Sequence, residues 1–265
     1  MRMRENGNTW QIFESRWANV AGSSVHTLVA EKLAPTGAPP LVVLSGFLVS
    51  SKHAATALVP LASVCNLYLP DLPGYGESDK PDHYLDVPDL ADMLASWMEA
   101  MGLESAVMLG GSFGSQVVAD FASRYPCSAR AVILACPTLD SSALPILGYL
   151  GRWMRNWLRE PPVSRNFLSD YHAAGAIRPL VQAYYAARDH IEEKLPHIRV
   201  PTLIVGGERD PIAPPRWCER LLHLLPNGSM TLLPGVAHSV VHRHPDLFAN
   251  VVRPFIGGAL LAEGR

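Results

Sequence analysis

The apolar residues of this 265-residue chain follow two different patterns. Residues 10–17 and 24–33 are rich in β-branched and aromatic residues, and the turn signal Ala21-Gly22-Ser23 between them predicts an antiparallel hairpin. After the Pro- and Gly-rich stretch 34–40, short continuous apolar runs alternate with longer segments of helical periodicity. The predicted elements are strand 41–45, helix 53–63, strand 65–69, helix 86–101, strand 106–110, helix 113–125, strand 130–135, strand 202–205, helix 215–225, strand 230–233 and helix 246–261.

This alternation predicts the fold class. Continuously apolar strands are typical of strands covered on both faces, and intervening helices imply right-handed crossovers in a parallel sheet. We therefore expect an α/β protein with a doubly wound, mostly parallel eight-stranded sheet. Residues 1–136 and 197–265 are predicted to form this core.

The alternation stops between residues 137 and 196, where several helices rich in Trp, Tyr and Arg are predicted. About sixty residues inserted after the sixth strand, before the sheet resumes, favour a helical lid over the carboxyl edge of the sheet, where ligands bind in such folds. A purely structural extension is the alternative interpretation.

The predicted helix around residues 147–158 indicates what the lid could contact. Its apolar residues recur at helical spacing, so they either line an acyl pocket or pack the lid on the core. The pocket candidates are Leu48, Trp153, Met154 and Trp157. Arg152, Arg155 and Arg159 either meet a substrate carboxylate or form a solvated face. Because 137–196 holds seven Lys or Arg and six Asp or Glu, no strong net field is expected there, and the predicted substrate is a medium-sized, mostly apolar ester or thioester.

Composition and charge narrow the class of protein. The chain is 48% hydrophobic and 17% charged, with a net charge of −2, which is typical of a globular enzyme. It has no Lys/Arg block, so neither nucleic acid nor an anionic membrane is expected as a partner. Its polar start leads to no apolar signal region, and its apolar runs are too short to span a bilayer. We expect a cytoplasmic protein that acts on a small molecule, and a homodimer is left open.

The four cysteines do not suggest a site. Cys65, Cys127, Cys136 and Cys218 are widely spaced and form no C-x-x-C pair. They are interpreted as reduced, mostly structural thiols rather than a disulfide or zinc framework. No cofactor and no metal are expected.

The most informative motif surrounds Ser112. Gly110-Gly111-Ser112-Phe113-Gly114 is a G-x-S-x-G between a predicted strand and a predicted helix. A sharp strand-to-helix turn exposes the serine hydroxyl and requires glycine or very small residues on either side of it. The helix that follows directs its N-terminal N–H groups toward a developing oxyanion. Ser112 is therefore the candidate nucleophile, the alternative being an ordinary strand-to-helix loop.

A serine nucleophile needs a histidine base and a carboxylate that orients the histidine. Asp210 and His238 each follow a predicted strand, and the order Ser, Asp, His along the chain is that of α/β-hydrolases. Glu208 competes with Asp210 for the carboxylate role. His242 and His244 lie within one turn of each other and lead into the closing helix, so they are interpreted as surface or helix-start residues. The H-x-x-x-H-x-H pattern comes with no HExxH and no clustered carboxylates, so it does not predict a metal site.

The oxyanion needs two preorganised donors, each contributing about 10²- to 10³-fold in rate. One is expected to be the N–H of Phe113, the residue after the nucleophile. The other is expected in Ser45-Gly46-Phe47-Leu48, after the strand 41–45, with Phe47 N–H as the candidate and Leu48 next.

These motifs resemble those of the α/β-hydrolase superfamily, in the lid-bearing group that includes carboxylesterases, epoxide hydrolases, haloalkane dehalogenases and carbon–carbon bond hydrolases. The resemblance covers residues 25 to 260. Asp71 to Asp79 is similar to the D-x-P-G-x-G-x-S loop, Gly206 to Asp210 with Pro214 is similar to G-x-x-D-x-x-x-P, and His238 with Pro245 reproduces the H-x6-P interval. The resemblance implies the fold above, with Ser112 as nucleophile, His238 as base and Asp210 as its orienting group.

Departures from the family pattern bear on the substrate. Ser112 argues against epoxide hydrolases and dehalogenases, which use an aspartate nucleophile. The chain has Ser45-Gly46 where members commonly have His-Gly, and it lacks the glycine- and proline-rich loops of proline iminopeptidases and ring-cleavage hydrolases. Arg243 stands where an acidic residue is frequent. A serine esterase is the leading hypothesis, with a carbon–carbon bond hydrolase, an iminopeptidase-like enzyme and a non-enzymatic binding protein on the same scaffold as alternatives.

Overall fold

A computed structural model describes residues 9–47, 49–140, 146–160, 170 and 174–262. These residues form one eight-stranded sheet with helices on both sides. The strands are β1 (Glu14–Val20), β2 (Ser23–Ala30), β3 (Pro40–Leu44), β4 (Asn66–Pro70), β5 (Ala106–Gly111), β6 (Ala129–Ala135), β7 (Thr202–Gly207) and β8 (Gly228–Leu233). The helices of the core are α1 (Ser51–Leu58), α2 (Val87–Ala100), α3 (Gly114–Arg124), α8 (Pro215–Leu224), α9 (Val240–Arg243) and α10 (Pro245–Ala262).

The strand order is β1-β2-β4-β3-β5-β6-β7-β8. β2 is antiparallel to both of its neighbours, and β3 through β8 run parallel to one another. The central strands are apolar and almost fully buried, as expected for a sheet covered on both faces. The predicted α/β architecture with a doubly wound, mostly parallel eight-stranded sheet is confirmed.

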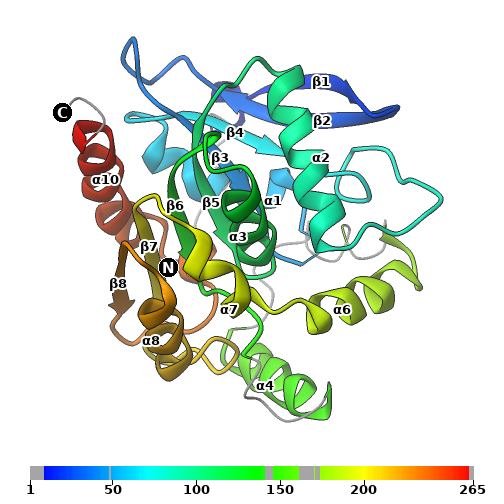
Figure 1. The fold of residues 1–265 in the computed structure, drawn as a ribbon, viewed down its shortest axis with the longest axis vertical. Helices are drawn as coiled ribbons and strands as arrows, with labels where there is room; N and C mark the ends of the chain where they lie inside the picture. The colour runs from blue at the N-terminus through cyan, green and yellow to red at the C-terminus, as the bar shows by residue number, and fades with distance from the viewer. Residues whose placement is uncertain (1–8, 48, 141–145, 161–169, 171–173, 263–265) are drawn as a thin grey trace.

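Helices pack against both faces of the sheet (Figure 1). α2 packs beside α3, and both contact strands of the sheet on the side facing the viewer. α1 contacts α10 and packs against β2 and β4. α8 contacts β7 and β8, which it connects. Because β3 and β5 to β8 run parallel, their carboxyl ends meet at one edge of the sheet.

The N-terminal boundaries differ from the sequence prediction. The first strand is Glu14–Val20 rather than 10–17, and a short 3-10 helix, η1 (Thr9–Ile12), precedes it. β1 is an edge strand with one neighbour, so its apolar pattern is weak and its bounds are the least constrained by the sequence. The helix predicted at 53–63 is also shorter, because α1 passes into the 3-10 turn η2 (Val59–Leu61).

Between β6 and β7 the structure has the helices α4 (Ile146–Arg159), α6 (Arg178–Arg188) and α7 (Ile191–Lys194), followed by the 3-10 turn η3 (Leu195–His197). α4 lies at the bottom of Figure 1 and α6 above it to the right, both beyond the strands. Among the described residues, no helix is both long enough and apolar enough to cross a bilayer.

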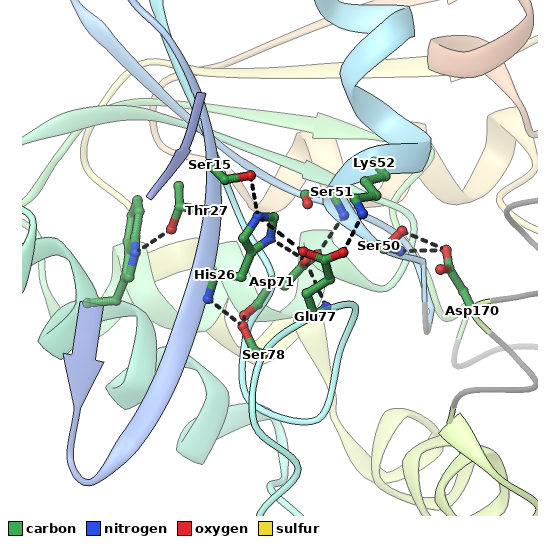
Figure 2. Close-up of polar contacts among 11 residues, drawn as sticks. Ser15, His26, Thr27, Ser50, Ser51, Lys52, Asp71, Glu77, Ser78 and Asp170 are labelled. Atoms are coloured by element: carbon green, nitrogen blue, oxygen red, sulfur yellow. Dashed lines mark hydrogen bonds and ion pairs between the residues drawn. The ribbon is translucent and has the colours of Figure 1, made fainter. Parts of the chain in front are cut away.

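A buried polar network holds the loop after β4 (Figure 2). The Asp71 carboxylate accepts hydrogen bonds from Ser51 N–H at 2.6 Å and Glu77 N–H at 3.2 Å, and it pairs with His26 Nδ1 at 3.0 Å. A Cβ on Gly76, whose φ is +45°, would lie 2.2 Å from this carboxylate. The D-x-P-G-x-G-x-S motif therefore has a structural explanation: it ties β2 and the start of α1 to the loop after β4.

Candidate active site

Three predicted residues meet at the carboxyl edge of the sheet. His238 Nε2 lies 2.9 Å from Ser112 Oγ, and His238 Nδ1 lies 2.7 Å from Asp210 Oδ2. Ser112 follows β5, Asp210 follows β7 and His238 follows β8. Because His238 Nδ1–H donates to Asp210, the neutral imidazole has Nε2 available to accept the proton of the serine hydroxyl.

The backbone at Ser112 has the geometry of a sharp turn. Its φ is +51°, a conformation that costs a non-glycine residue about 1–2 kcal/mol. A Cβ on Gly110 would lie 2.5 Å from Gly114 O, and a Cβ on Gly114 would lie 2.5 Å from Leu44 O. Both positions of the motif therefore have to be glycine, and Ser112 is held in a strained conformation between β5 and α3.

Asp210 is buried and fully engaged. Its Oδ1 accepts hydrogen bonds from Ile212 N–H at 2.7 Å and Ala213 N–H at 3.0 Å, while Oδ2 faces His238. Burial acts to raise its pKa, but attraction to His238 and these hydrogen bonds together hold the pKa of Asp210 below its ordinary value. The carboxylate is thus ionised and oriented at neutral pH.

His238 is affected in the opposite sense. Burial acts to lower the pKa of its imidazole, but attraction to Asp210, the hydrogen bond to Asp210 and the nearby charge of Glu160 raise it above the ordinary value. A raised pKa makes this imidazole a stronger base than an isolated histidine.

The other carboxylate considered from sequence lies elsewhere. Glu208 is exposed, and its Oε2 accepts a hydrogen bond from Gly235 N–H at 2.8 Å. This hydrogen bond connects the loop after β7 to the turn after β8, which explains the position of Glu208.

The expected oxyanion loop passes next to the serine. A Cβ on Gly46 would lie 3.5 Å from Ser112 Cβ, so the chain after β3 comes close to the nucleophile candidate. The rings of Phe47 and Phe113 meet edge to face with centroids 6.0 Å apart. Leu48, the second choice for an oxyanion donor and a pocket candidate, lies outside the described residues.

Ser112 opens into a cavity of about 730 Å³ between the carboxyl edge of the sheet and helices α4 and α6. Trp153 and Trp157, both predicted for the pocket, line it with stacked rings whose centroids are 5.9 Å apart. Met154, the third lid candidate, is 43% exposed and is not among the lining residues. The lining is mostly apolar, including Phe47, Phe113, Leu139, Leu180 and Ile212.

From the sequence, His242 is interpreted as a surface or helix-start residue. It lies in the short helix α9 and also lines this cavity, with its ring centroid 4.4 Å from that of His53. Burial, followed by repulsion from His53 and His238, lowers the pKa of His242 to about 3. Burial also lowers the pKa of His53, although attraction to Asp170 opposes it. The cavity is therefore lined by a pair of neutral imidazoles at neutral pH, which the sequence spacing of His53 and His242 did not indicate.

Two further polar residues in the cavity were missed. Glu160 follows α4, and its Oε2 accepts a hydrogen bond from the backbone N–H of Ser239. Asn156 Oδ1 is buried and makes no hydrogen bond with any described residue. Both line the cavity. No local motif marks either residue, because they reach the site only through the packing of α4.

One cluster near the site has metal-ligating residue types. Atoms of Cys136, Asp210 and His238 lie within 4.8 Å of one another. Burial, with the nearby charge of Asp210, raises the pKa of the Cys136 thiol well above its ordinary value, which opposes the thiolate that a metal requires. Both Asp210 oxygens already accept hydrogen bonds. The arrangement therefore suits a thiol donor beside the carboxylate better than a metal ligand set.

Comparisons with known proteins identify the family of the chain. A model of the alpha/beta hydrolase family matches residues 41–251. The chain belongs to this family. Its matched region includes Ser112, Asp210 and His238, which are the residues that the alpha/beta hydrolase fold brings together here.

Relatives of this alpha/beta hydrolase include bacterial esterases. It is 25% identical over 247 residues to the hydrolase YugF of Bacillus subtilis (strain 168), covering 83% of this chain and 90% of YugF. It is 27% identical over 238 residues to a pimeloyl-(acyl-carrier protein) methyl ester esterase of Neisseria meningitidis serogroup B, covering 80% of this chain and 90% of that enzyme.

Solved structures share the fold. A membrane phospholipase A described as a bacterial virulence factor superposes with a TM-score of 0.81 at 21% identity, covering 94% of this chain and 87% of its own. Carboxylesterase CesB of Bacillus subtilis superposes with a TM-score of 0.77 at 18% identity, covering 95% of each chain.

Proposed function

We propose that this protein is a serine hydrolase that cleaves a carboxylic ester or thioester of a medium-sized, mostly apolar molecule through an acyl-enzyme on Ser112. The observation that carries the proposal is the continuous hydrogen-bonded chain from Ser112 through His238 to Asp210, opening into a largely apolar cavity. The esterase names of several relatives support it.

In the first half of the reaction, His238 Nε2 takes the proton of Ser112 as Oγ attacks the carbonyl carbon. Asp210 stabilises the imidazolium that forms and keeps the ring in the required tautomer. The tetrahedral intermediate collapses when His238 donates its proton to the leaving alcohol or thiol, and the acyl group stays on Ser112.

In the second half, His238 activates a water molecule that attacks the acyl carbon, releases the acid and restores the serine. We assign the oxyanion to the backbone N–H groups of Phe47 and Phe113, at the loop beside Ser112 and the start of α3. Each such donor contributes about 10²- to 10³-fold to the rate.

The cavity favours an uncharged acyl chain. Its lining is mostly apolar, and the His53–His242 pair is neutral at neutral pH. A substrate carboxylate beside these two histidines would lose its hydration without gaining a cationic partner. We further propose that 137–196 acts as a lid, with Trp153 and Trp157 of α4 closing over the acyl chain.

The first test is labelling with a fluorophosphonate, followed by intact mass measurement. We expect one adduct on the wild-type protein and none on Ser112→Ala, with Ser96→Ala on the surface of α2 as the matched control that keeps the adduct. Hydrolysis of p-nitrophenyl butyrate should fall by about 10³-fold or more in Ser112→Ala and in His238→Ala. A Ser112→Ala protein with undiminished hydrolysis contradicts the proposal.

The same preparation distinguishes the alternatives. Turnover of p-nitrophenyl esters of four to eight carbons supports the esterase assignment. Efficient cleavage of a β-diketone with poor ester turnover supports carbon–carbon hydrolysis instead, and release of p-nitroaniline from proline p-nitroanilide supports an iminopeptidase. No turnover and no adduct on folded protein support a binding role.

A further inference from the structure

A second concavity lies on the other side of α4 from the substrate cavity. It has a volume of about 410 Å³ and lies between α4 and the loop that follows β7. Five of its nine lining residues are arginines. We call it the arginine cleft and define it by Arg152, Arg155, Arg159, Arg209 and Arg216.

Two carboxylates, Glu208 and Asp210, line the arginine cleft, and a third, Asp140, lies beside it; all three already have partners. Asp210 is bonded to His238 and to backbone amides, and Glu208 accepts from Gly235 N–H. Asp140, which is buried, pairs with Arg152 at 2.9 Å and lies 4.0 Å from Arg216. Five guanidinium groups thus face three carboxylates, so the cleft carries an excess of positive charge. The charges of 137–196 nearly balance, so the sequence of that segment did not predict this cluster of arginines. Arg209 and Arg216 come from outside the segment.

The two walls of the cleft come from distant parts of the chain. Arg152, Arg155 and Arg159 project from one face of α4, whereas Trp153 and Trp157 of the same helix line the substrate cavity. Arg159 donates a hydrogen bond to the backbone carbonyl of Arg209 at 3.0 Å, which joins the helix to the loop. The loop wall contains Pro211 and Pro214, whose rings restrict its backbone.

We propose that the arginine cleft binds a phosphate-bearing ligand that carries two or more negative charges. Guanidinium groups present planar pairs of N–H donors that match phosphate oxygens. Several guanidinium groups held close together repel one another, and a polyanion between them removes that repulsion. The volume exceeds that of a single phosphate group, which favours a diphosphate or an organic phosphate.

Asp210 lines the cleft, whereas Ser112 does not. This inference does not depend on the proposed hydrolase function, because phosphate binding needs the arginines and no acyl-enzyme. The ligand instead bridges α4, which forms a wall of the substrate cavity, and the loop that carries Asp210. A bound phosphate is therefore placed to hold α4 against the core.

The test is isothermal titration of the protein with inorganic pyrophosphate, at an ionic strength held constant with sodium chloride. We expect saturable binding to the wild-type protein and at least a tenfold weaker affinity in the double variant Arg155→Gln/Arg216→Gln. Arg155 is exposed and the Arg216 side chain is 71% exposed, so both can be replaced without disturbing the core. Arg199→Gln, an exposed arginine outside the cleft, is the matched control and should bind as the wild type does.

Two controls make the outcome decisive. Ser112→Ala should bind pyrophosphate unchanged, which separates a failure of this proposal from a failure of the hydrolase proposal. The second control is a titration with sulfate. Three results would overturn the proposal: no saturable binding of pyrophosphate, the same affinity in the double variant as in the wild type, or the same affinity for sulfate as for pyrophosphate.

The source of the phosphate is distinguished by sedimentation with phosphatidylcholine vesicles that contain phosphatidic acid. Pyrophosphate binding without sedimentation supports a free phosphate ligand. Sedimentation that the double variant loses and Arg199→Gln keeps supports a lipid headgroup in the same cleft. Sedimentation that the double variant retains shows that the arginine cleft is not the site of vesicle binding and counts against the lipid source.

Discussion

Glu160 Oε2 accepts a hydrogen bond from the backbone N–H of Ser239 at 2.9 Å. Glu160 directly follows α4, and Ser239 is the residue after His238. This bond joins the segment between β6 and β7 to the loop that carries the proposed base. The Glu160 charge also acts on the imidazole, so the position of α4 and the protonation of His238 are linked.

Replacing Glu160 should change the pH dependence of hydrolysis. Burial lowers the pKa of His238, while Asp210 and then Glu160 raise it. Glu160→Gln keeps the size of the side chain and removes the charge, so the pKa of His238 falls. The neutral imidazole is the base, so the acidic limb of the kcat/KM profile should move to lower pH. Glu193→Gln, an exposed residue of α7, is the matched control, and superimposable profiles for Glu160→Gln and wild type would refute the link.

Gly110 should not tolerate a methyl group, whereas its neighbour should. A Cβ at Gly110 would lie 2.5 Å from Gly114 O and 2.7 Å from Ser115 Cα, but a Cβ at Gly111 has its nearest contact at 3.8 Å. Gly110→Ala is expected to lower the free energy of unfolding by about 1–3 kcal/mol or more, because the backbone must move to relieve the overlap. Urea unfolding of both variants checks this, and an equal cost for Gly111→Ala would contradict the explanation.

The cysteines should react with a thiol reagent in two classes. Cys65, Cys136 and Cys218 are buried, and burial raises the pKa of Cys65 and of Cys218 to about 12. Cys127 is exposed. Folded protein should therefore take up one equivalent of Ellman's reagent rapidly, and unfolded protein four. Cys127→Ser should abolish the rapid reaction, and rapid uptake of more than one equivalent by folded wild type would show that a buried thiol is accessible.

His242 should make the folded state less stable in mild acid. Burial and then repulsion from His53 and His238 hold its pKa at about 3 in the folded state, against 6.5 for an unperturbed histidine. Between these pH values the unfolded state binds a proton that the folded state does not. His242 therefore leaves the free energy of unfolding unchanged above pH 6.5 and lowers it progressively as the pH falls toward 3. The variant His242→Asn removes this contribution.

Urea unfolding at pH 7 and pH 5 measures the effect. We expect the free energy of unfolding to fall less between these pH values in His242→Asn than in the wild type. His223→Asn, an exposed histidine of α8, should keep the wild-type dependence. An unchanged pH dependence in His242→Asn would mean that His242 is solvated enough to titrate normally.

Much of the core could be predicted from sequence because its signals are local. Continuous apolar runs mark the buried strands β3 to β7, and the two glycines around Ser112 follow from steric overlap within a few residues. The positions of Asp210 and His238 after their strands follow from the same logic, since parallel strands end at one edge of the sheet. The bounds of β1 were less accurate, because an edge strand has one partner and a weak apolar pattern.

The remaining features depended on packing between distant segments. His53 and His242 face each other because α1 lies against α9, and Glu160 reaches Ser239 because α4 lies over the edge of the sheet. The arginine cleft combines three residues of α4 with Arg209 of the loop after β7 and Arg216 of α8, which no spacing along the chain relates. Local periodicity and turn chemistry act through neighbouring residues, whereas these contacts arise only when the folded backbone brings separate elements together.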